Sequence, residues 1–153
     1  MGVSYDYFRA ALDETAPRAD QIAGGPSVGG ATGVVETTWV DPWVRVGRLH
    51  FEIAGRAWTY DGSMAVQIVP ESPIGPEDWD LPTVHRLSDE VRDSLAGVAD
   101  DDRSELGRWW AGTEEFVLDR ADAAGVASLC SDLLRLCREA RDAGEHVYVW
   151  SAM

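Results

Sequence analysis

The sequence predicts a single α+β domain spanning residues 1–153, in which a small mixed sheet packs against several helices. A chain of this length is long enough for one domain with its own core, and no linker is long enough to divide it. Hydrophobic residues make up 45% of the chain and include seven tryptophans, which supplies the apolar surface that such a core needs. The spacing of these residues alternates between strand and helix periods and ends in one long helix followed by a final strand.

The first part of the chain predicts two strands separated by a short helix and a loop. Residues 3–8 alternate aromatic and β-branched side chains, as a strand does. We expect a short helix at 15–23. The segment 24–33 holds five glycines and a proline, so it is predicted to be a loop. Residues 34–40 then favour a second strand.

The next segment, 43–54, has two possible interpretations. Asp41 can cap a helix with Pro42 at its first position, and Gly55 suits the end of that helix. The competing interpretation is a strand, because Val44 and Val46 alternate with arginine and glycine. We favour the helix because the apolar residues keep helical spacing. These residues are Trp43, Val46, Leu49 and Ile53.

The middle of the chain is predicted to be irregular and the part after it helical. Four prolines fall within 57–82, so we expect little regular structure there. A brief strand starts at Thr83. Ser88 then caps a helix whose first turn carries acidic residues, which the helix dipole favours. Another short helix is expected to start at 100–102 and to end near Gly112.

The most regular pattern is the helix predicted over 122–143, which Gly144 ends and a strand at 146–150 follows. Both cysteines, Cys130 and Cys137, fall on this helix. Seven helical residues separate their Cα atoms by about 10.5 Å, beyond the roughly 7 Å that a disulfide allows. We therefore expect two reduced core thiols, which are typical of a cytoplasmic protein.

Charge restricts the classes of function. All thirteen basic residues are arginines, against 27 acidic residues, and the formal net charge is −14. The absence of lysine excludes Schiff-base chemistry and a phosphate loop with its lysine. Such an acidic chain is a poor match for nucleic acid and a good one for a basic protein partner. We find no signal peptide and no run of about 18 apolar residues, so we expect no membrane association.

No catalytic or metal-binding signature stands out. Residues 25–29 spell G-x-S-x-G, but they lie in a glycine-rich loop without the strand and helix that a nucleophile elbow needs. The histidines His50, His85 and His146 are far apart and lack metal-ligand spacing. We therefore expect no cofactor and no metal. An alternative is a small enzyme or ligand-binding domain whose site the fold assembles around His50 and His85.

Trp79 marks the candidate partner-binding segment. It stands among Glu77, Asp78 and Asp80 in the proline-rich region. An aromatic side chain within an acidic rim is the arrangement expected of an anchor for a basic surface. The other interpretation is that Trp79 pins a long loop onto the core.

Short motifs along the chain resemble the YfbM-like family, a bacterial domain of unknown function. The resemblance rests on the following motifs: Met1-Gly2 with Tyr7-Phe8, Leu49-His50-Phe51 followed by Ala54-Gly55, Leu87 to Val91 with Leu95, and the closing helix and strand from Leu133 to Trp150. The chain departs from the family at Trp43, which lies six residues before Leu49 instead of three. The resemblance implies an α+β fold and a helix at 43–54, and it brings no established activity, cofactor or catalytic residue.

Together these features predict a non-enzymatic cytoplasmic interaction protein of a regulatory or immunity type that covers a basic protein surface. Glu77, Asp78, Trp79 and Asp80 are its predicted contact residues. The sequence leaves the identity of the partner and the oligomeric state open.

Overall fold

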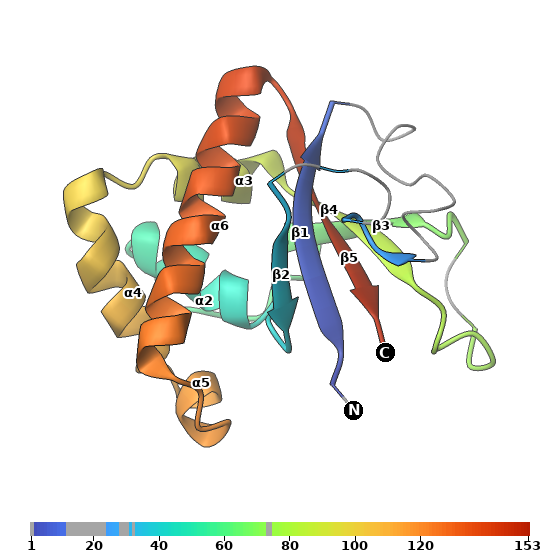
Figure 1. Cartoon of the computed structure of the whole chain (residues 1–153), viewed down its shortest axis with the longest axis horizontal. Coiled ribbons are helices and arrows are strands. Elements are labelled where there is room, and N and C mark those ends of the chain that lie inside the picture. The colour runs from blue at the N-terminus through green and yellow to red at the C-terminus, as the bar shows by residue number, and fades with distance from the viewer. Residues whose placement is uncertain (1, 12–23, 28–30, 32, 73–74) are drawn as a thin grey trace.

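The computed structural model describes residues 2–11, 24–27, 31, 33–72 and 75–153, so the helix predicted at 15–23 lies outside the described residues. A five-stranded sheet carries the described α-helices on one of its faces (Figure 1), which confirms a single-domain α+β fold. The strands are β1 Ser4–Ala10, β2 Val35–Thr38, β3 Ala65–Val69, β4 Thr83–Leu87 and β5 His146–Ala152. The helices are α2 Arg45–Ile53, α3 Asp89–Ala96, α4 Arg103–Ala111, α5 Glu114–Leu118 and α6 Ala123–Ala143, with short 3₁₀ turns at Gly62–Met64 and Asp100–Asp102.

The strand order is β2-β1-β5-β4-β3, and every pairing is antiparallel. The expected mixed sheet is therefore wrong in this detail. The strands that pair are joined by long connections, which permit either direction, so the sequence carried no signal for it. The order leaves β2 and β3 as the two edges of the sheet.

The segment 43–54, for which the sequence allowed a helix or a strand, is a helix over most of its length. Residues 45–53 are helical, as the apolar spacing favoured, and the Asp41 carboxylate accepts hydrogen bonds from the N–H groups of Trp43 and Val44 at 2.9 and 2.7 Å.

The expectation of a mostly irregular stretch at 57–82 is wrong for β3. Every proline of that stretch follows β3, so none of them interrupts the apolar run Ala65–Val69.

Helix α6 organises the core on the helical face of the sheet. The Asp122 carboxylate caps it by accepting the Gly125 N–H at 2.8 Å, and Gly144 ends it in the left-handed conformation at φ 67°. Its buried face meets Tyr7 of β1 and Val147 and Val149 of β5 in one apolar cluster. The predicted free thiols are confirmed, since Cys130 and Cys137 are both unpaired and buried on this face.

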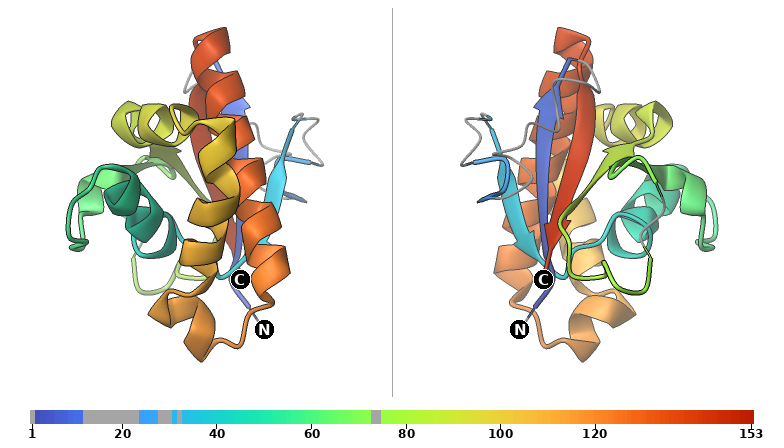
Figure 2. Two further views of the ribbon diagram at one scale, coloured as in Figure 1. Left: turned by 90° about the vertical axis from the view of Figure 1, so that its left-hand side faces the viewer. Right: turned by 90° about the vertical axis from the view of Figure 1, so that its right-hand side faces the viewer.

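Helix α6 lies alongside the middle of the sheet, next to β1 and β5, and β2 stands out beside it (Figure 2). Strand β2 pairs with β1 from Ser4–Thr38 to Tyr7–Val35. Within β2, Val35 and Thr37 are buried, whereas Glu36 and Thr38 are exposed. The described helices include none long and apolar enough to span a bilayer.

Candidate functional site: an acidic groove between β2 and α6

A groove of about 750 Å³ runs between edge strand β2 and helix α6. Its volume falls within the roughly 300–1,000 Å³ typical of ligand sites. One end lies where Gly33 approaches the Glu139 carboxylate, and the other where Arg45 pairs with Asp119 just before α6. Strand β2 and helix α6 therefore run in opposite directions along its two walls.

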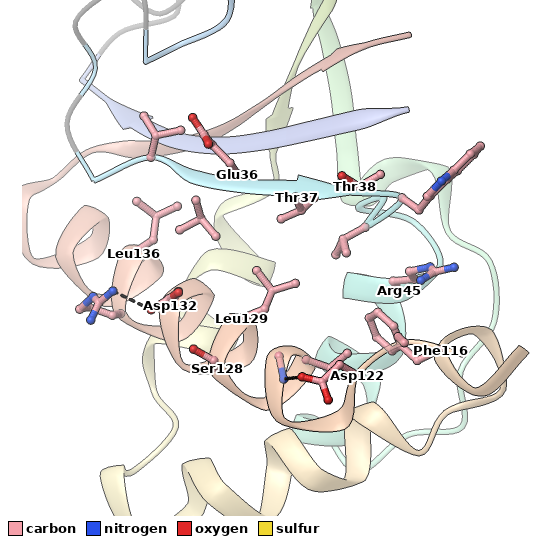
Figure 3. Close-up of a pocket in the computed structure, with 18 of the residues that line it drawn as sticks. Glu36, Thr37, Thr38, Arg45, Phe116, Asp122, Ser128, Leu129, Asp132 and Leu136 are labelled. Atoms are coloured by element: carbon pink, nitrogen blue, oxygen red, sulfur yellow. Dashed lines mark hydrogen bonds and ion pairs between the residues drawn. The ribbon is translucent and has the colours of Figure 1, made fainter. Parts of the chain in front are cut away.

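Apolar side chains form the floor of the groove. Figure 3 shows Leu129 and Leu136 of α6 pointing toward β2, with Thr37 opposite them and Phe116 near the Arg45 end. Val35 and Leu136 are almost fully buried. The floor therefore belongs to the core of the protein, and the walls are held in place by it.

The charged residues of the groove are mostly acidic. Among the described residues, Asp119, Asp122, Asp132 and Glu139 line it, against Arg45 and Arg135, whereas the Glu36 carboxylate lies on the opposite face of β2 (Figure 3). The carboxylate of Asp132 pairs with Arg135 at 2.7 Å, and Glu139 lies 3.8 Å from Arg9. These pairs are partly exposed, so each contributes little to stability, and the carboxylates that line the groove still outnumber its arginines.

Arg45 closes one end of the groove. Its guanidinium pairs with Asp119 and stacks 4.7 Å from the centre of the Phe116 ring. Its main-chain carbonyl accepts a 2.8 Å hydrogen bond from the indole N–H of the buried Trp110. This arginine is thus fixed at both its main chain and its side chain, and little of its charge is free to offset the carboxylates.

Trp39 stands at the same end, directly after β2, with 49% of its side chain exposed. Its φ angle of 65° is in the left-handed region, which costs an L-residue roughly 1–2 kcal/mol. Hydrogen bonds hold both sides of it: its N–H donates to Val3 at 2.8 Å, and the Val40 carbonyl accepts from the Tyr7 hydroxyl at 2.6 Å. A Cβ at Gly2 would lie 2.9 Å from the indole nitrogen, so only glycine fits beneath this ring.

The outer edge of β2 carries main-chain groups that no described strand pairs with. The Trp39 N–H donates a hydrogen bond to the Val3 carbonyl of the chain next to β2. In an antiparallel pair the main-chain N–H and C=O groups of alternate residues point to opposite sides, so those of residues 35, 37 and 39 face β1. The N–H and C=O groups of Glu36 and Thr38 therefore point away from β1. In the described part of the chain no strand pairs with this edge.

The predicted contact segment lies elsewhere, in the connection between β3 and β4. Two turns shape it: the Asp78 N–H donates to Gly75, and the Leu81 N–H donates to Asp78, both at 3.0 Å. Trp79 is 63% exposed, so it does not pin the loop onto the core. Glu77, Asp78 and Asp80 are exposed beside it, outside the β2–α6 groove.

The two histidines of the alternative site do not line this groove either. His50 is buried on α2 with its ring against Phe51, and burial lowers its pKa. His85 on β4 packs edge-on against Trp43 at 5.0 Å, and burial also lowers its pKa. Each imidazole therefore packs against a different aromatic ring. Among the described residues, no group of three or more histidines, cysteines or carboxylates could hold a metal ion.

A second hollow of about 660 Å³ lies between α2, α3 and α4. Trp109 lines it and is 37% exposed, whereas its neighbour Trp110 is fully buried. The acidic residues that line this hollow are Glu52, Asp93, Asp102 and Glu105. No strand edge lines it, so it does not offer a template for strand addition.

In comparisons with known proteins, no family model, no curated protein and no solved structure matches the chain.

Proposed function

We propose that the chain is a non-enzymatic, acidic interaction domain that binds a basic segment of another protein in the β2–α6 groove. The observation that carries the proposal is the groove itself, in which four carboxylates and two arginines of the described residues surround an apolar floor beside a strand edge that no described strand covers. A regulatory or immunity-type role, as a cover for a basic protein surface, fits this chemistry.

The wider setting of the proposal follows from composition. The charge of −14 raises the encounter rate with a basic partner and disfavours nucleic acid. The two buried thiols suit the reducing cytoplasm. The resemblance to the bacterial YfbM-like family, which rests on motifs such as Leu49-His50-Phe51, is part of the same proposal and adds no activity to it.

A binding experiment with matched variants tests the proposal. The probe is a heptapeptide of alternating arginine and valine, titrated by NMR at two salt concentrations. We expect weaker binding at higher salt, because screening reduces attraction between exposed charges. The groove variant Asp132→Asn/Glu139→Gln should weaken binding several-fold.

The control variant Glu77→Gln/Asp78→Asn removes the same two charges from the other acidic segment. It should bind nearly like the parent, because it keeps the carboxylates of the groove while its net charge equals that of the groove variant. If the control loses affinity and the groove variant does not, the contact surface is the loop around Trp79. If the probe does not bind at all, the proposal is wrong.

A further inference from the structure

We infer that the bound segment is an extended strand that pairs with the outer edge of β2 and is anchored at one end by Trp39. The inference rests on the proposed function and specifies its mode of recognition. The partner it defines is a stretch of chain with basic side chains and free main-chain N–H groups, in place of a helix or a folded basic surface.

The main chain of β2 offers an edge for strand addition. The N–H and C=O groups of Glu36 and Thr38 face away from β1 and meet no other described strand. An open edge of this kind is the template for strand addition, in which main-chain hydrogen bonds supply affinity. The four residues of β2 can hold a short segment of similar length.

The two faces of the added strand would both meet carboxylates. Side chains of a strand alternate between faces, so those on one face would lie over the groove floor, beside Asp132 and Glu139. Those on the other face would lie next to Glu36, which is exposed on the opposite side of β2 (Figure 3). Both faces therefore offer carboxylates, and basic side chains suit either position.

The conformation of Trp39 supports its role as the anchor. A turn out of β2 with positive φ costs glycine nothing, yet a large aromatic residue occupies it. Its half-exposed indole lines the groove where the strand ends, and the bonds at Val3 and Val40 fix the chain on both sides. Strained residues that their surroundings hold in place cluster at binding sites, and Trp39 is one of the two such residues in the described part of the chain. Exposed tryptophan is also the residue type most often found as a binding anchor.

Hydrogen exchange of single amides tests the pairing with the intact chain and the arginine–valine heptapeptide. At saturating peptide the Glu36 and Thr38 amides should exchange at least about tenfold more slowly, because they become hydrogen-bonded. The Val35 and Thr37 amides face β1 already and serve as internal controls that should change little. Peptides with N-methyl groups on alternate amides keep their charge, and one of the two alternating sets should lose binding.

The substitution Trp39→Gly tests the anchor. Glycine accepts the positive φ without strain, so the variant should be at least as stable as the parent while its Kd rises about tenfold or more, as expected for loss of an aromatic anchor. A purely structural role predicts the reverse, with stability lost and affinity kept, and would overturn the anchor.

The outcomes separate the two proposals. If the peptide binds the groove and the Glu36 and Thr38 amides exchange as before, strand addition is wrong and the proposed function stands. If the peptide does not bind, both are wrong.

Discussion

Asp6 shows how the fold perturbs a single ionisable side chain. Its partner across β1 and β2 is Glu36, and its partner on β5 is Trp150. Burial raises the pKa of the Asp6 carboxyl to about 6; the Thr37 main-chain N–H opposes this rise and the Glu36 carboxylate adds to it. In the unfolded chain an aspartate has a pKa of about 3.9. The folded state therefore holds this proton more tightly than the unfolded state.

The sign of the pH dependence follows from this difference. Between about pH 4 and pH 6 the folded chain binds more protons at Asp6 than the unfolded chain, so this residue's contribution to stability is lost as the pH rises. We expect Asp6→Asn to be more stable than the parent at pH 7, by about 1 kcal/mol once solvent screening of a half-exposed group is allowed for. Urea denaturation of both proteins at pH 4 and pH 7 measures it. An equal difference at the two pH values would contradict the prediction.

The sequence predicts Trp79 as a binding anchor from its acidic neighbours, whereas the proposed anchor Trp39 carries no such signal, and the binding experiments above decide between them. Trp79 is flanked by Asp78 and Asp80, which gave it a visible signature. Trp39 has no charged neighbour before Asp41, and its positive φ and its place at the groove exist only once β2 and α6 are assembled. The sequence offers one signal for Trp39, which is that a bulky aromatic residue stands at the end of a predicted strand, just before the helix cap Asp41.

Among the elements, helices α4 and α6 pack tightly against each other at Gly107. A Cβ added at Gly107 would lie 3.1 to 3.3 Å from Ala127, close to its Cα, Cβ and carbonyl oxygen. Backbone atoms of a packed helix cannot move aside individually. The glycine therefore lets α4 pack closely enough for Trp110 to be fully buried.

Gly107→Ala sets helix propensity against packing. Alanine favours a helix over glycine by about 0.5–1 kcal/mol, whereas overpacking a tight contact costs about 1–3 kcal/mol. We expect a net loss of about 1 kcal/mol in the free energy of unfolding, measured by chemical denaturation. Ser104→Ala, at an exposed position of the same helix, changes propensity alone and should be neutral or slightly stabilising. A stabilised Gly107→Ala protein would show that the two helices separate easily.

Elements with local signals were predictable, and those whose pairing is distant were not. Helix α6 has a cap, a long apolar face and a terminal glycine, and its predicted bounds are within one residue of those observed. Strand β3 was missed because prolines nearby outweighed its five apolar or neutral residues. Strand order and the groove depend on contacts between β2 and a helix some ninety positions later, which no local pattern encodes.

The whole molecule is governed by its excess of negative charge. Thirteen arginines face 27 carboxylate side chains, and several of them pair across the fold, as Arg48 does with Glu115 at 2.8 Å and Arg138 with Asp100 at 2.8 Å. The unpaired remainder repels itself more strongly in the compact state than in the expanded chain. Exposed ion pairs contribute only about 0–1 kcal/mol each, so repulsion should be the larger long-range effect.

Salt screens both the repulsion of the excess charge and the attraction within the ion pairs, so the sign of its effect on stability shows which of the two is larger. At pH 7, raising sodium chloride from 10 to 200 mM should increase the free energy of unfolding by about 1 kcal/mol, since screening relieves the repulsion of 14 excess charges more than it weakens the exposed pairs. The control is the same comparison near the isoelectric point of about 4.4, where the net charge vanishes and only the loss of attraction remains. There the same salt should leave stability unchanged or lower it. Destabilisation by salt at pH 7 would show instead that the arginine pairs outweigh the repulsion.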